Sequence, residues 1–166
     1  SPISLGDSHR GYRVMGTDAG YFQHYKYGRG QPLKFDKGQP FADIYDAVVG
    51  ADVARSLNYE LSDEIIISHG LASTKFSDHE NKPFTIVGIL ERTGTPVDRT
   101  VHIPLEGIEA VHVDWRGHGQ LPMQLTAEQT RKINLQPKTI TAFMIGLNNR
   151  INTFRLQRKI TEFTKE

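Results

Sequence analysis

The sequence contains no cysteine, and this absence removes several classes of site at once. A chain without thiols has no disulfide framework, no thiolate zinc site and no cysteine nucleophile. The absence does not fix the compartment, because chains without cysteine occur in the periplasm and in the cytosol alike.

Long apolar runs and a strong charge of one sign are also missing. No run approaches the roughly 20 residues that cross a bilayer. No signal peptide opens the chain, which starts at Ser1-Pro2 without Met, so we interpret it as a mature or excised fragment. The 20 Lys and Arg residues nearly balance the 19 Asp and Glu residues, for a formal net charge of +1. We therefore expect no nucleic-acid partner.

The composition is that of an ordinary globular protein. Of the 166 residues, 37% are hydrophobic and 23% are charged. This length suits one domain, or two small lobes that share a core.

Short strand-like segments recur along the chain, separated by Gly, Pro and polar turns. β-branched and apolar runs predict strands at residues 12–15, 32–35, 47–50, 65–67, 84–90 and 100–105, and we also place a strand at 138–147.

Helical spacing of apolar residues predicts a smaller number of helices. Val53, Ala54 and Leu57 indicate a helix with Asp52 as its N-cap and Asn58 as its stop. Further helical segments are predicted at 105–111, within 127–133, and after Asn149. Together these patterns predict an α+β fold, with a mixed sheet and helices packed on it.

The familiar catalytic motifs are absent. The sequence has no Gly-x-Ser-x-Gly nucleophile elbow and no phosphate-binding loop, and Gly28-Arg29-Gly30 is an incomplete dinucleotide fingerprint. Spacing alone assigns no pair of carboxylates to acid–base chemistry. We therefore predict no catalytic residue and no enzyme.

The seven histidines raise the question of a metal site. Zinc accepts imidazole and carboxylate ligands, so His69, Asp78 and His79, which surround one polar stretch, are the candidate ligands. No His-Glu-x-x-His pair is present, and scattered loop histidines are usually solvated. The prediction is therefore no cofactor, with a metal-binding module that uses loop histidines as the alternative. A hydrolase with an unrecognised cleft is a third possibility.

Two stretches resemble a known family. The first covers residues 46–57 and 61–67, and the second covers residues 83–90, 94–99 and 101–105. In order and spacing they are similar to the MacB-like periplasmic core domain of FtsX-like ABC-transporter permeases. Ser62-Asp63 replaces the usual Gly-Asp, and Gln39 replaces an Arg of the family's lead-in. The resemblance covers residues 33–110 and extends more weakly to 138–163.

The resemblance implies a role outside the cytoplasm. It implies that residues 1–166 form an extracytoplasmic core domain, with a β-rich lobe at about 43–112 and an α/β lobe in the remainder. The parent permease would lie in the bacterial inner membrane with this domain in the periplasm. It would work with a cytoplasmic ATP-binding subunit and a second permease copy or paralogue. Its substrate would be a periplasmic protein, lipoprotein or peptide.

Contact residues are expected in loops, where binding groups concentrate on a rigid scaffold. The loops at 70–82, 91–99 and 114–125 are the candidates. Within them we select Asp98 and Arg99, together with Trp115, the single tryptophan, because tryptophan is enriched at binding hot spots.

Overall fold

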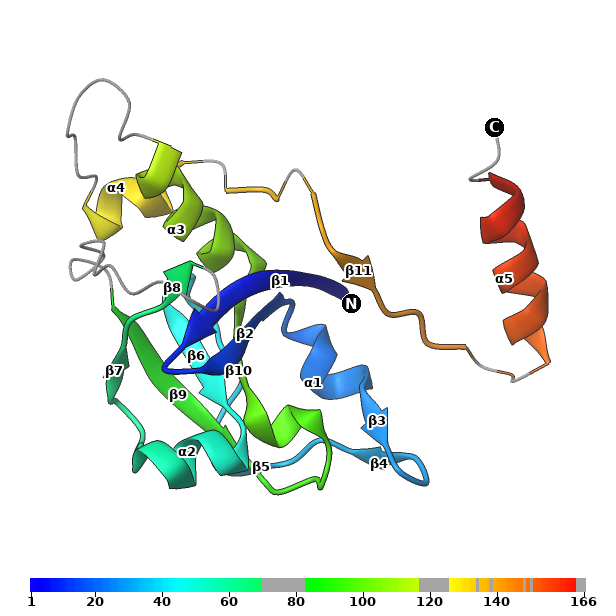
Figure 1. Ribbon diagram of the computed structural model, residues 1–166, viewed down its shortest axis with the longest axis horizontal. Coiled ribbons are helices and arrows are strands. Elements are labelled where there is room, and N and C mark those ends of the chain that lie inside the picture. The colour runs from blue at the N-terminus through cyan, green and yellow to red at the C-terminus, as the bar shows by residue number, and fades with distance from the viewer. Residues whose placement is uncertain are drawn as a thin grey trace.

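One mixed β-sheet organises the chain in the computed structural model (Figure 1). The structure describes residues 1–69, 83–116, 126–133, 135–137, 139–147, 149 and 151–163. The side chains of residues 69, 112–116 and 127 are outside the description. No helix within these ranges is both long and apolar enough to cross a membrane.

The main sheet has nine described strands. Seven of them follow the order β11-β1-β2-β10-β6-β9-β5, while β7 pairs with β9 and β8 pairs with β1. Their bounds are β1 (Pro2–His9), β2 (Tyr12–Thr17), β5 (Phe35–Gly38), β6 (Asp46–Val49), β7 (Glu64–Ile65), β8 (Ser68–His69), β9 (Phe84–Leu90), β10 (Thr100–Pro104) and β11 (Ala142–Phe143). The pairs β2–β10 and β6–β9 are parallel and the other pairs are antiparallel. The predicted mixed sheet is therefore confirmed.

Five α-helices, a 3₁₀ turn and a small hairpin complete the described structure. They are α1 (Gly20–His24), α2 (Ala51–Leu57), η1 (Pro96–Arg99), α3 (Leu105–Arg116), α4 (Ala127–Arg131), α5 (Asn152–Phe163) and the hairpin of β3 (Lys26–Tyr27) with β4 (Gln31–Pro32). The helices packed on the sheet confirm the predicted α+β class. The predicted division into two lobes stays a prediction.

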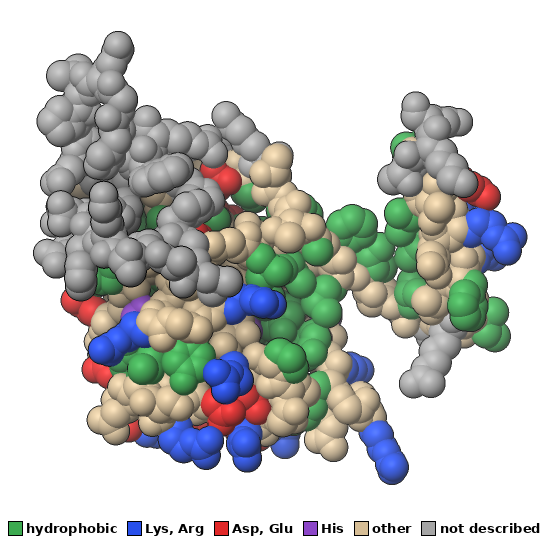
Figure 2. Space-filling view, in the orientation of Figure 1, with side chains coloured by type: hydrophobic (Ala, Val, Ile, Leu, Met, Phe, Trp, Pro, Cys, Tyr) green, Lys and Arg blue, Asp and Glu red, His purple; other side chains and the backbone are tan. Residues whose placement is uncertain are grey.

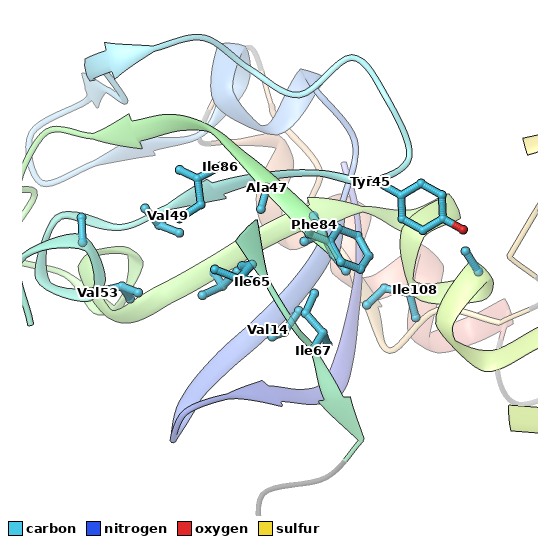
Figure 3. Close-up of a cluster of buried hydrophobic side chains, with 14 of the residues drawn as sticks. Val14, Tyr45, Ala47, Val49, Val53, Ile65, Ile67, Phe84, Ile86 and Ile108 are labelled. Atoms are coloured by element: carbon cyan, nitrogen blue, oxygen red, sulfur yellow. The ribbon is translucent and has the colours of Figure 1, made fainter. Parts of the chain in front are cut away.

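One face of the sheet carries the larger apolar core (Figure 3). Alternate residues of the central strands, such as Val14, Val49 and Val101, point to this face and are fully buried. Helices α2 and α3 cover it with residues that include Val53 and Ile108. Phe84 lies in the same cluster, with its ring 5.6 Å from that of Tyr45.

The opposite face is covered by aromatic residues. Tyr21 and Phe22 of α1 pack there with Phe41, over Met15 and Val48. Because Met15 and Val48 alternate with the residues of the first face, the two cores share the same strands. The strands β2, β10 and β6 are thus covered on both faces, which holds the ends of these strands rigidly.

Several predicted elements are confirmed. Strands at 12–15, 47–50, 84–90 and 100–105 match β2, β6, β9 and β10 to within two residues. Asn58 ends α2 in the left-handed conformation, with φ 55°. The helical turns predicted in 127–133 and the helix predicted after Asn149 are α4 and α5.

Other predictions are wrong in detail. The N-cap of α2 is Gly50, not Asp52, so the helix starts two residues earlier than predicted. The strand predicted at 65–67 is divided, since Ile65 pairs with β9 whereas the chain from Ser68 pairs with β1. The run 32–35 likewise divides between β4 and β5.

The described residues beyond 138 make little contact with the sheet. The strand predicted at 138–147 shortens to β11, which pairs only with Pro2 and Ile3 at the start of β1. Helix α5 has no buried residue, and Figure 1 shows it apart from the body of the fold.

Candidate functional site

The loop at 91–99 is held in shape by one buried carboxylate. Asp98 is only 2% exposed. One of its oxygens accepts hydrogen bonds from the backbone N and the Oγ1 of Thr93, both at 2.7 Å, and the other accepts from the backbone N of Gly94 at 2.7 Å. A buried carboxylate needs such donors, and these hydrogen bonds fix the loop around it. Asp98 therefore shapes the loop rather than facing outward as a contact residue.

The 3₁₀ turn η1 ends the loop and positions the start of β10. Thr95 caps the turn by accepting from the backbone N of Val97 at 3.3 Å, and Pro96 supplies the fixed φ of its first position. Thr100 Oγ1 donates to the carbonyl of Pro96 at 2.9 Å. The turn is therefore closed by hydrogen bonds at both ends.

Gly50 lets the start of α2 approach the same turn. A Cβ at this position would lie 2.2 Å from the carbonyl oxygen of Val97 and 2.5 Å from that of Asp98. Its backbone N donates to the carbonyl of Thr100 at 2.9 Å. Only glycine allows this approach, so α2 supports the loop from behind.

Arg99 lies at the end of this loop, with its side chain exposed to solvent. Its guanidinium carbon lies 5.6 Å from the centroid of the Tyr12 ring, within the range of a cation–π contact. Arg99 is exposed and Tyr12 is partly buried, so the ring supports a charged group that remains open to solvent. The predicted contact residues Asp98 and Arg99 thus have different positions, one inside the loop and one on its surface.

Tyr12 was not selected from the sequence as a site residue, and the hairpin that positions it was not predicted. Arg10 and Gly11 have φ 47° and 84°, so they form the two-residue turn with positive φ that matches the twist of paired strands. His9 pairs with Tyr12 across this turn. The Arg-Gly dipeptide before Tyr12 was the available signal, because glycine favours such turns.

His102 is buried among aromatic rings with one nitrogen unsatisfied. Its ring lies 5.6 Å from that of Tyr21 and 5.7 Å from that of Phe22. Nδ1 donates to the Val48 carbonyl at 3.2 Å, whereas Nε2 has no hydrogen-bond partner within the described residues. Complete burial lowers the pKa of His102 to about 4, so the imidazole is neutral at physiological pH.

His9 is also buried, but both of its nitrogens are used. Nδ1 lies 2.6 Å from the Ile66 carbonyl and therefore donates to it, while Nε2 accepts from the Tyr59 hydroxyl at 2.7 Å. Burial lowers the pKa of His9 below its usual value. The imidazole joins β1 to the segment between β7 and β8, which is a structural role.

Arg131 joins α4 to the chain before β6. Its guanidinium donates two hydrogen bonds, each 3.0 Å, to the two carboxylate oxygens of Asp43, and it lies 5.3 Å from the centroid of the Tyr45 ring. The Arg131 hydrogen bonds lower the pKa of Asp43. This ion pair holds α4 near the start of β6.

The remaining predicted site residues lie at the limits of the description. Trp115 falls in α3, where only the backbone is described. His69 is in β8, again as backbone alone, and Asp78 and His79 lie outside the described residues. In the part of the chain that is described, no group of three His, Asp or Glu residues could hold a metal ion. The metal prediction for His69, Asp78 and His79 therefore stays untested.

Large apolar side chains are exposed near the C-terminus (Figure 2). Phe154 and Phe163 of α5 are 77% and 84% exposed, and Phe143 of β11 is 57% exposed. They form no part of the loop site around Arg99.

One solved structure that is similar to the chain resembles it only weakly. A domain of a protein named as a presumed permease, from Porphyromonas gingivalis, is 11% identical with a TM-score of 0.39, and the match covers 62% of this chain and 42% of that one. The chain thus spans less than half of that structure. No curated protein matches the chain.

A family model, in contrast, matches almost the whole chain. The model of the MacB-like periplasmic core domain covers residues 2–162. This match extends beyond the motifs at 46–67 and 83–105, from the start of β1 into α5. The chain belongs to the family of MacB-like periplasmic core domains, which are periplasmic domains of ABC-transporter permeases.

Proposed function

We propose that this chain is the non-catalytic periplasmic part of a permease that couples ATP hydrolysis in a cytoplasmic subunit to the handling or export of a substrate outside the inner membrane. Membership of a family whose domains are generally non-catalytic supports this proposal. The expected partners are the ATP-binding subunit, a second permease copy or paralogue, and a periplasmic protein, lipoprotein or peptide.

The observation that carries the proposal is the family match over residues 2–162, and the structure adds a candidate contact surface in the loop that ends in Arg99. The Asp98 carboxylate and the tight packing at Gly50 fix the loop before any partner arrives. A contact surface that is already ordered loses less conformational entropy on binding, which favours recognition by the loop. Arg99, exposed and held over Tyr12, is the residue we assign to partner contact.

Trp115 stays a second proposed contact residue. We expect Trp115→Ala to weaken partner binding while leaving the fold intact. Loss of the folded state in this variant, seen by circular dichroism, would assign Trp115 to the core instead.

Two measurements on the parent protein test the proposal. In spheroplasts, external protease should cleave this chain. Without protease, the intact chain should sediment with the membrane fraction. After detergent extraction, the parent protein should copurify with an ATPase. If the chain resists protease until the inner membrane is lysed, or no ATPase accompanies it, the proposal is wrong.

A further inference from the structure

The topology brings three arginines to one end of the sheet. Because β2 and β10 are parallel, with Arg13 paired to Thr100, both strands begin at the same edge. Arg10 lies in the turn just before β2, and Arg99 immediately precedes Thr100. Arg13 alternates with Tyr12 along β2, so its side chain leaves the strand on the face opposite to Arg99, at the same end of the sheet. We call the end of the sheet that carries Arg10, Arg13 and Arg99 the arginine surface.

Within the described residues, no ion pair neutralises the charges of the arginine surface. All three side chains are exposed, and none forms an ion pair in the described part of the chain. Neighbouring carboxylates are already engaged. Asp98 is buried in its own loop, and Asp52 is shared between Arg55 at 2.8 Å and Arg92 at 3.5 Å. The formal charge of the whole chain is only +1, so this excess is local.

The arginine surface also has a fixed geometry. Arg10 is held in a two-residue turn with positive φ, and Arg99 follows a turn closed by the Asp98 carboxylate. The Tyr12 ring supports the Arg99 guanidinium from below. Guanidinium groups match the planar fork of a carboxylate and donate two hydrogen bonds to it, which ammonium groups do less well.

We propose that the arginine surface binds a carboxylate-rich segment of a protein partner. The proposal rests on the proposed function, since it gives the chemistry of the partner that the loop contacts. A lipid surface fits less well, because adsorption to a bilayer usually combines basic residues with inserted apolar ones. None of the large exposed apolar side chains in the described chain belongs to residues 9–14 or 91–99.

A binding assay with the 166-residue chain tests this directly. The probe is a fluorescein-labelled peptide of alternating Glu and Gly, with a Gln and Gly peptide as its uncharged counterpart, measured by fluorescence anisotropy at low and high salt. The test variant combines Arg10→Gln, Arg13→Gln and Arg99→Gln. The matched control combines Lys26→Gln, Arg29→Gln and Lys34→Gln, three exposed cations around the β3–β4 hairpin that lower the net charge equally.

The proposal predicts that the Glu peptide binds, that the Gln peptide does not, and that salt weakens the complex. The test variant should lose affinity by about tenfold or more, since three exposed ion pairs are removed, and the control variant should change it by less than about twofold. Circular dichroism confirms that both variants fold.

Three results would overturn the proposal. The first is that the Glu peptide does not bind. The second is that both variants weaken peptide binding equally, which would indicate an effect of net charge alone. The third is that phosphatidylglycerol vesicles bind through the same arginines while the peptide does not. The outcome is separate from the cell fractionation above: a periplasmic chain that ignores the peptide refutes only this inference, and a cytoplasmic chain that binds it refutes only the permease function.

Discussion

The carboxylate of Asp98 binds Thr93 twice, through the backbone N and the Oγ1, each at 2.7 Å. This relationship predicts that Asp98→Ala destabilises the fold by about 3 kcal/mol, because several donors lose a charged acceptor in a buried place. Urea unfolding followed by circular dichroism measures it. Asp36→Ala, an exposed carboxylate on β5, is the control and should change stability by less than about 0.5 kcal/mol. Equal stability of the two variants would mean that Asp98 does not organise the loop.

The close approach at Gly50 gives a second prediction. Gly50→Ala places a Cβ 2.2 Å from the Val97 carbonyl oxygen, so either α2 or η1 must move. We expect a loss of roughly 1–3 kcal/mol in the free energy of unfolding, together with weaker partner binding. Gly146→Ala is the matched control, because a Cβ there meets no atom within 4 Å. If Gly50→Ala is as stable as Gly146→Ala, the tight contact is not required.

His102 predicts a dependence of stability on pH. Its pKa of about 4 in the folded state lies below the usual 6.5, so the unfolded chain binds more protons between these values. Stability should therefore be fully present above pH 6.5 and fall as the pH drops toward 4, by about 3 kcal/mol in total.

His102→Phe should remove this part of the pH dependence while keeping an aromatic ring in the cluster. Tyr21→Phe, which retains His102, should keep the slope of the wild type. Urea unfolding at several values between pH 7 and 4.5 compares the three proteins. Parallel curves for wild type and His102→Phe would contradict the buried neutral imidazole.

Removal of α5 should leave the sheet intact. The helix has no buried residue, so a chain that ends at Leu147 should keep its melting temperature to within about 2 °C. A chain that ends before Thr139 also loses the backbone hydrogen bonds of Thr141 to Ile3 at 2.9 Å and of Met144 to Ser1 at 2.8 Å. That shorter chain should melt at a lower temperature. Differential scanning calorimetry of both chains separates the contribution of α5 from that of β11.

The sheet could be predicted largely because its central strands are rich in apolar and β-branched residues. β6 and β9 have this character because they are covered on both faces, and their β-branched residues mark them in the sequence. β1 was missed, since Gly6, Asp7 and Ser8 interrupt its pattern and its pairing depends on distant strands. Ile65, Ile66 and Ile67 resemble one strand, although the chain changes partner between β7 and β8.

The site was only partly predictable, because its contacts join residues that are far apart in the sequence. The composition of residues 93–99 indicates a loop, but not that Asp98 turns inward and Arg99 outward. Tyr12 and Arg99 are far apart in sequence, and only the parallel pairing of β2 with β10 brings them together. Contacts of this kind depend on the register of the sheet, which local sequence patterns do not contain.

Site-specific photocrosslinking in cells that make the full permease shows whether a partner contacts the arginine surface. A benzophenone amino acid is placed at position 10 or 99 on the arginine surface, or at position 29 or 34 around the β3–β4 hairpin. Positions 10 and 99 should crosslink to an acidic periplasmic partner, and positions 29 and 34 should not. Crosslinking from 29 and 34 in the absence of any from 10 and 99 would contradict this prediction, because the partner would then bind a different face of the domain.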